Sequence, residues 1–268
     1  MTDLRTSLHG LWLPLITPFR HGELDETSLR RMVRHYTAFA VNGMILAATT
    51  GESLTLTLAE TERLVRAARD EAGKTRNLPL LLGLSGSNTR ALLDMLERTA
   101  AWAIDGYLIS CPYYSRPSQQ GMRLHFEALA DRARHPVMLY NIPYRTGVNL
   151  GNAAMLQLAD HPNILGCKDC CADRGQSLEL LRRRPRKTSP CLPARMRNVM
   201  KRWSMAPTAA FWPPRISKPK PSRKYAGCGL RAKATPRCNG GGRSPISPGC
   251  CSPSLVRRRS STGCGAAA

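Results

Sequence analysis

A single lysine, Lys168, closes the apolar run 163–167, a pattern typical of a buried strand. Burial disfavours the charged form of a lysine and lowers its pKa, and a neutral amine is a nucleophile that attacks carbonyl carbons. Lysines at strand ends more often extend their charged group into water, so Lys168 alone does not indicate catalysis. Other reactive residues must be found near it.

Hydroxyl, phenol and guanidinium groups stand at or just after three other apolar runs. Two threonines and a glycine offer hydroxyls and backbone N–H groups that suit a small carboxylate, two phenols can relay protons, and an arginine can hold a carboxylate with two hydrogen bonds. Each could instead be a cap, a packing aromatic or a surface cation. Taken together, they favour carbonyl chemistry on the lysine. The residues are Thr49, Thr50, Gly51, Tyr114, Tyr140 and Arg145.

Six apolar segments alternate with six amphipathic segments along residues 10–181. The expected strands are 10–18, 43–48, 78–83, 106–110, 136–141 and 164–168, and the expected helices are 28–39, 58–72, 89–102, 119–132, 152–159 and 176–181. Asp25 and Thr57 stand where they can cap the first two helices. Such regular units, without a glycine-rich dinucleotide loop, favour an α/β TIM (β/α)8-type barrel, of which about six units are recognisable. The polar groups would then meet at the carboxyl ends of the strands.

The composition changes sharply after residue 181. Residues 1–181 carry 19 Lys and Arg against 18 Asp and Glu, whereas residues 182–268 carry 21 Lys and Arg and no acidic residue. The net charge of +22 therefore belongs almost entirely to the last third. We divide the chain into an incomplete barrel catalytic domain, 1–185, and a basic segment rich in proline, glycine, arginine and cysteine, 186–268.

Two explanations compete for the basic segment. One is a disordered tail that binds nucleic acid; the other is GC-rich coding DNA read out of frame. Six cysteines, Trp203 and Trp212 are unusual in a basic tail, and the break falls inside a barrel, so we favour the out-of-frame origin and do not expect nucleic acid as a partner. Strands one and six would then have unpaired edges, and we expect poor solubility and little activity.

Metal and membrane partners are not expected. Cys167 and Cys170 have C-x-x-C spacing, but no second pair with zinc-ligand spacing follows. The sequence has no apolar stretch of membrane-spanning length, and its N-terminal residues lack the pattern of a signal peptide, so we expect a cytoplasmic protein.

Four ordered motifs resemble the dihydrodipicolinate synthase and N-acetylneuraminate lyase family of Schiff-base aldolases. They are T-T-G-E-S at 49–53, P-Y-Y-x-R-P at 112–117, Y-N-x-P-x-R-T-G at 140–147 and G-x-K-[DE] at 166–169, and the resemblance covers about residues 10–185. The Thr-Thr pair and Arg145 favour the branch of 4-hydroxy-tetrahydrodipicolinate synthases. This resemblance implies condensation of pyruvate with aspartate 4-semialdehyde to 4-hydroxy-tetrahydrodipicolinate, on the route to diaminopimelate and lysine. It implies a covalent lysine–pyruvate imine and no separate cofactor.

The resemblance also implies a role for each candidate residue and a homo-oligomer, a tetramer in the family. Lys168 would form the imine. Tyr140 and Thr49, together with the trans-acting Tyr114 from a partner subunit, would relay protons. Thr50 and Gly51 would hold the carboxylate of pyruvate, and Arg145 would hold the carboxylate of the semialdehyde. Tyr144 replaces a small residue beside the arginine, which leaves open another pyruvate aldolase, one like N-acetylneuraminate lyase or with another aldehyde partner. An inactive truncated remnant also stays open.

Overall fold

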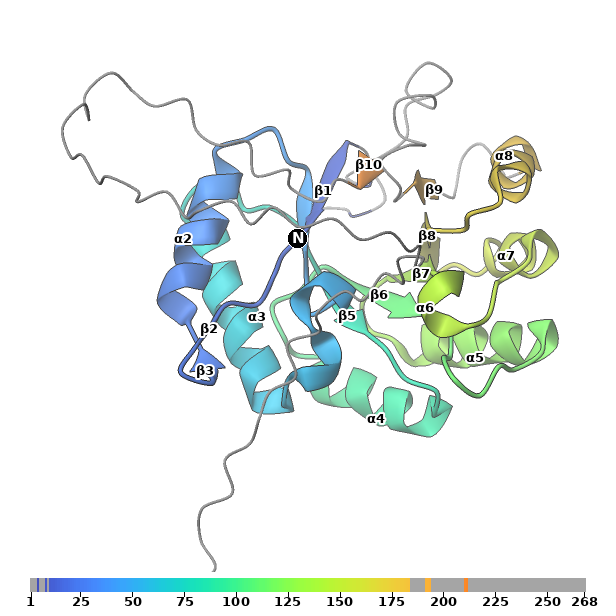
Figure 1. Cartoon of the computed structure of the whole chain (residues 1–268), viewed down its shortest axis with the longest axis horizontal. Helices are drawn as coiled ribbons and strands as arrows, with labels where there is room; N and C mark the ends of the chain where they lie inside the picture. The colour runs from blue at the N-terminus through green and yellow to red at the C-terminus, as the bar shows by residue number, and fades with distance from the viewer. Residues whose placement is uncertain (1–3, 5–7, 9, 184–190, 194–209, 212–268) are drawn as a thin grey trace, which may run out of the picture. The chain divides into compact units, whose positions relative to one another are not determined.

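The computed structural model describes residues 4, 8, 10–183, 191–193 and 210–211. Eight parallel strands form one sheet in the order β10-β1-β4-β5-β6-β7-β8-β9, and the helices lie on the outer side of the strands (Figure 1). The strands are β1 Leu11–Pro14, β4 Gly43–Leu46, β5 Leu80–Leu84, β6 Gly106–Ser110, β7 Val137–Asn141, β8 Ile164–Asp169, β9 Cys191–Pro193 and β10 Ala210–Phe211. The central six confirm the predicted strands, and this architecture is that of a partial TIM barrel.

Helices follow each of the six central strands, as the periodicity predicted. They are α2 Glu26–Thr37, α3 Leu58–Gly73, α4 Thr89–Thr99, α5 Gln119–Arg132, α7 Asn152–Leu158 and α8 Arg174–Arg183. Asp25 caps α2 by accepting a hydrogen bond from the Ser28 N–H at 3.0 Å, and Thr57 forms a capping box with Glu60 at the start of α3. No helix in the described residues has the length and apolar character needed to cross a membrane.

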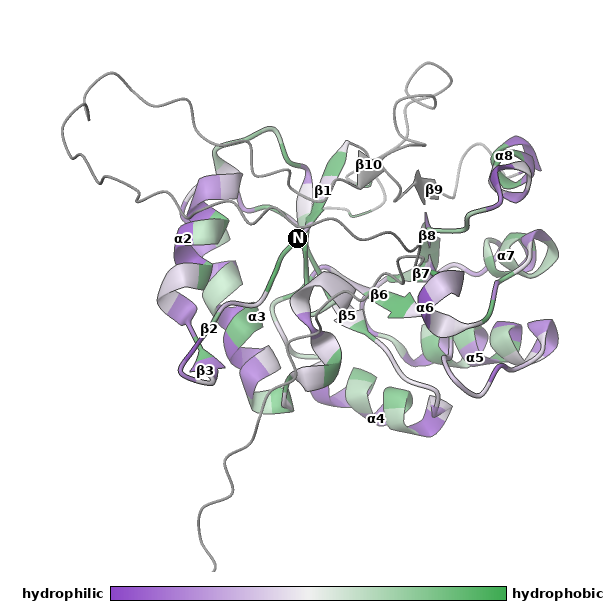
Figure 2. Ribbon diagram, in the orientation of Figure 1, coloured by the Kyte–Doolittle hydropathy of each residue, from purple (hydrophilic) through white to green (hydrophobic). Residues whose placement is uncertain are grey.

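Side chains from the two faces of the sheet fill separate cores. One face packs against the helices, whose hydrophobic stripes turn towards the strands (Figure 2). The other face forms an inner cluster that includes Trp12, Leu81, Met138 and Tyr140. Trp12 is fully buried, and it fits only because the neighbouring strand carries Gly43, where a Cβ would lie 2.4 Å from the indole ring. Alternate residues of each strand thus reach either the helix layer or the inner face.

The sequence did not predict several short elements. They are the hairpin β2 Phe19–Arg20 and β3 Glu23–Leu24, the 3-10 helices η1 Thr49–Gly51 and η2 Ser53–Thr55, and the single turn α6 Pro143–Thr146. Elements this short carry no hydrophobic period that a sequence pattern can reveal.

The prediction that the first and sixth strands have unpaired edges is wrong, so these edges no longer support the poor solubility and little activity that the sequence led us to expect. β10 pairs with β1 through the partners Leu11–Ala210 and Trp12–Phe211, and β9 pairs with β8 from Cys167 to Asp169. The reason is that an open strand edge presents backbone N–H and C=O groups to any extended segment, whatever its side chains. The rest of the predicted disordered segment 186–268 lies outside the described residues.

Candidate active site

Lys168 and Tyr140 occupy neighbouring positions on two paired strands. They are in register between β7 and β8, so both side chains project from the same face of the sheet. The Lys168 Nζ lies 4.2 Å from the centroid of the Tyr140 ring. Both residues are buried, with 5% and 6% of their surfaces exposed. The geometry therefore places an amine and a phenol together at the inner, carboxyl end of the sheet.

Burial changes the acid–base properties of both groups. Desolvation lowers the pKa of Lys168 to about 8, although an electrostatic interaction with Cys170 opposes part of this effect. Desolvation also raises the pKa of Tyr140 well above its usual range, so the phenol stays protonated at neutral pH. An interaction with the side chain of Thr49 opposes part of this rise, which places Thr49 next to the phenol. A fraction of the Lys168 amines is therefore neutral at pH 7, and the protonated Tyr140 phenol next to Thr49 can donate a proton.

A strained turn holds Thr49 beside this pair. Ala47, just after β4, has a φ of 47°, and Glu52, which closes η1, has a φ of 56°, both unusual for residues with a side chain. Gly83 of β5 lies against the turn: a Cβ at this position would come within 2.4 Å of the Ala47 carbonyl oxygen. The backbone of the turn that carries Thr49 therefore packs directly against the backbone of β5 at Gly83, which holds the turn in place.

Gly51 was predicted to help bind the pyruvate carboxylate, but its backbone N–H already makes another hydrogen bond. Its N–H donates to the Ala48 carbonyl at 2.9 Å, and its own carbonyl accepts a hydrogen bond of 2.7 Å from the Thr17 hydroxyl. This N–H is therefore already used within the turn. Within residues 49–51, the exposed hydroxyls of Thr49 and Thr50 remain to bind a carboxylate.

A cavity of about 510 Å³ opens at this end of the sheet. Two predicted residues, Thr49 and Arg145, line it, while Tyr140 does not line it but interacts with Thr49. The guanidinium of Arg145 lies 5.7 Å from the centroid of the Tyr144 ring, which brings a cation to the wall of the cavity. The lining residues are Thr49, Glu52, Ser53, Leu54, Thr55, Ser85, Ser110, Tyr113, Ile142, Tyr144, Arg145 and Thr146.

Tyr114 does not join this cluster within its own chain. Its side chain is 93% exposed, and its backbone has a φ of 68°. Its neighbour Tyr113 lines the cavity instead. A tyrosine side chain this exposed is available to contact another molecule. The trans-acting role of Tyr114 stays a prediction.

The sequence did not lead us to predict a buried hydrogen-bond network on the helix side of β7 and β8. Asn141 and Asp169 directly follow Tyr140 and Lys168, and the Asn141 amide donates to the Asp169 carboxylate at 3.2 Å. Ser177 of α8 donates to the same carboxylate at 2.5 Å. Because successive strand residues face opposite sides, this clamp ties β7 to β8 on the helix side while the amine and phenol face inwards. The Y-N and K-D pairs in the motifs were the signal for it.

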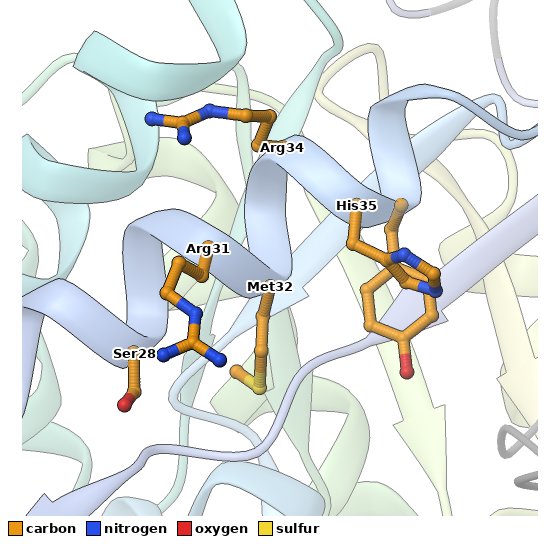
Figure 3. Close-up of a pocket in the computed structure, with 6 residues that line it drawn as sticks. Ser28, Arg31, Met32, Arg34 and His35 are labelled. Carbon is orange, nitrogen blue, oxygen red and sulfur yellow. The ribbon is translucent and has the colours of Figure 1, made fainter. Parts of the chain in front are cut away.

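A second hollow lies away from this cluster. It measures about 500 Å³ and is lined by residues of α2, namely Ser28, Arg31, Met32, Arg34, His35 and Tyr36 (Figure 3). Arg34 is bound to Glu71 at 2.7 Å. None of the predicted site residues lines it.

Comparison with known proteins agrees with this geometry. The model of the dihydrodipicolinate synthetase family matches residues 7–189. 4-Hydroxy-tetrahydrodipicolinate synthase 2 of Clostridium acetobutylicum is 38% identical over 178 residues, or 66% of this chain and 62% of that protein. The synthase of Methanospirillum hungatei is 40% identical over 170 residues, or 62% of this chain and 57% of that protein. The chain thus spans about three fifths of the length of these relatives.

Solved structures show the same fold. The lysine-bound dihydrodipicolinate synthase of Cyanidioschyzon merolae superposes with a TM-score of 0.72 at 28% identity, over 77% of this chain and 70% of that one. A monomeric dihydrodipicolinate synthase variant gives a TM-score of 0.73 at 27% identity, over 79% and 71% of the two chains.

The fold and the buried lysine define a partial parallel βα-barrel protein with an amine–phenol pair at the carboxyl ends of its strands. The family match covers most of the chain, and the chain belongs to the dihydrodipicolinate synthetase family.

Proposed function

We propose that Lys168 forms an imine with pyruvate and that the resulting enamine condenses with aspartate 4-semialdehyde to give 4-hydroxy-tetrahydrodipicolinate. The observation that carries this proposal is the buried Lys168 amine, with a pKa of about 8, at 4.2 Å from the ring of a protonated Tyr140. The relatives named 4-hydroxy-tetrahydrodipicolinate synthase support the choice of substrates.

The proposed reaction proceeds in three steps. The neutral Lys168 amine attacks the keto carbon of pyruvate, and loss of water gives an imine whose protonated nitrogen can accept electrons. A methyl proton then leaves, the enamine forms, and its carbon bonds to the aldehyde carbon while the aldehyde oxygen takes up a proton. The Tyr140 phenol, relayed through Thr49, is the group positioned to move these protons. The amino group of the semialdehyde then attacks the imine carbon and displaces the Lys168 nitrogen, which closes the ring of the product and restores the lysine amine, and no separate cofactor enters.

Thr50 and Arg145 are assigned to bind the two substrates. Thr50, on the turn held by Gly83, binds the pyruvate carboxylate, and the exposed Arg145 guanidinium on the cavity wall binds the carboxylate of the semialdehyde. Exposed Tyr114 completes the proton relay in a neighbouring copy, so the active form is a homo-oligomer. A cytoplasmic location is part of the same proposal.

Tyr144 favours a second candidate, a pyruvate aldolase with another aldehyde partner. Its ring is 61% exposed at the cavity wall and stacks with Arg145, so it narrows the space next to the carboxylate-binding group. Both candidates share the lysine imine and differ in the aldehyde that is accepted.

Borohydride trapping tests the proposal directly. The full chain is incubated with pyruvate and sodium borohydride, and intact mass and peptide mapping should place a reduced pyruvyl adduct on Lys168. Lys168→Met is the matched control and should show no adduct. An unmodified wild-type chain would refute the imine. Turnover with a panel of aldehydes then separates the two candidates, because aspartate 4-semialdehyde should be the preferred substrate.

A further inference from the structure

Ser110 ends β6 in the same row as Tyr140 and Lys168. It is in register with Tyr140, which is in register with Lys168, so three adjacent parallel strands carry the three residues side by side. Residues in register on parallel strands face the same side of a sheet, and neighbouring strands are about 4.8 Å apart. Ser110 therefore faces the inner end of the sheet, one strand from the phenol and two from the amine.

The Ser110 hydroxyl has no hydrogen-bond partner among the described residues, although only 4% of the residue is exposed. Burying a hydroxyl without a partner is unfavourable, and buried polar groups are normally paired. Three other buried side-chain atoms in the described part of the chain share this condition, in Trp12, His125 and Asn152. None of these three residues lines the cavity of about 510 Å³ that Thr49 and Arg145 line, whereas Ser110 does. An unpaired hydroxyl at the wall of the site is what a bound substrate would satisfy.

The residues that line the cavity around Ser110 indicate which of the two substrates its hydroxyl would bind. Ser110 shares the cavity with Ser85, Tyr113 and Arg145, while Lys168 does not line it. The Tyr140 strand also separates Ser110 from the lysine, so a keto acid bonded to Lys168 occupies the neighbouring position. A molecule that contacts both Ser110 and Arg145 is the second substrate, with a carboxylate for the arginine and an oxygen for the hydroxyl.

We propose that the Ser110 hydroxyl donates a hydrogen bond to an oxygen of the acceptor aldehyde while the keto acid is held on Lys168. This assignment rests on the proposed function and deepens it: the site selects aldehydes with two oxygen-bearing ends, one for Arg145 and one for Ser110. Ser110 thereby determines specificity for the second substrate and takes no part in forming the imine.

The test measures binding without turnover. The full-length chain is treated with pyruvate and borohydride, and the reduced protein, which can no longer form an enamine, is titrated with succinate semialdehyde by calorimetry. Ser110→Ala should weaken binding about 3- to 10-fold, the loss expected for one neutral hydrogen bond. Ser110→Cys, which keeps the shape but is a weak donor, should weaken it similarly. The yield of pyruvyl adduct should be the same in all three proteins.

Thermal unfolding provides a second readout. Removing an unpaired buried hydroxyl should raise the Tm of ligand-free Ser110→Ala by about 2–4 °C. A lower Tm would show that the hydroxyl has a structural partner, and an unchanged affinity in Ser110→Ala would show that the aldehyde does not use it; either result overturns the assignment. Absence of the adduct in the wild-type chain would instead refute the proposed function. An adduct with no semialdehyde binding would refute the Ser110 assignment alone.

Discussion

The pH dependence of imine formation is set by the pKa of Lys168. Burial lowers this pKa from 10.5 to about 8. At pH 7 an amine with a pKa near 8 is neutral in about one molecule in ten, against about one in three thousand for an ordinary lysine, roughly a 300-fold difference in reactive amine. We expect the rate of pyruvate imine formation to rise about tenfold per pH unit below pH 8 and to level off above it.

The assay is a timed borohydride quench of the full chain with pyruvate between pH 6 and 10, read by intact mass. Two matched variants test the cause. Tyr140→Phe should slow the reaction but leave the midpoint near pH 8, because the phenol carries no charge in this range. Cys170→Ala should lower the midpoint, because the interaction with Cys170 raises the pKa of Lys168. A rate that keeps rising tenfold per pH unit up to pH 10 would show that Lys168 is hydrated and would refute the reasoning.

Three further predictions concern stability and are read from urea unfolding of the full chain. Lys168→Met should raise the free energy of unfolding at pH 7 by up to about 3 kcal/mol, because a lysine with a lowered pKa costs stability at every pH below its unfolded value of about 10.5. Burial lowers the pKa of His125 from 6.5 to about 4, so stability should fall by up to about 3 kcal/mol as the pH drops from 6.5 to 4, and His125→Gln should flatten this part of the profile. Asn141→Ala should cost about 3–5 kcal/mol, because it breaks bonds to Asn149 at 2.9 Å, to Asp169 at 3.2 Å and from the Leu150 N–H at 3.1 Å.

Each stability prediction has an outcome that contradicts it. A less stable Lys168→Met protein would mean that the lysine is satisfied by its surroundings. A stability profile that is flat between pH 4 and 6.5 would place His125 in water. A loss below about 1 kcal/mol in Asn141→Ala would show that the clamp is replaced by water at little cost.

Local signals were enough to predict the six central strands and helices. The caps Asp25 and Thr57 lie where the sequence placed them, and α5 begins and ends at the predicted residues. A cap and a hydrophobic period depend on residues a few positions apart, so they can be read without the fold. The strands β9 and β10 could not be predicted, because their pairing depends on backbone groups and the open edges of β8 and β1.

The site was predictable in part for the same reason. Parallel strands bring their carboxyl ends together, so the meeting of Lys168, Tyr140 and Thr49 followed from the strand assignments. The engagement of the Gly51 N–H depends on a 3-10 turn that no pattern marks. The outward direction of Tyr114 depends on a positive φ, which the sequence does not reveal for a tyrosine. The roles of all these residues stay predictions.

The close contact between Gly83 and the Ala47 carbonyl limits how this protein can diverge. Any side chain at Gly83 would clash with the Ala47 carbonyl oxygen and displace the β4–η1 connection, and Thr49 with it. Substitutions at Gly83 therefore cannot change the keto-acid site gradually, because even the smallest side chain displaces the turn that carries Thr49. The opposite wall, at exposed Tyr144, has room for substitution. New aldehyde preferences should thus arise at this wall, while the keto-acid site stays unchanged across variants.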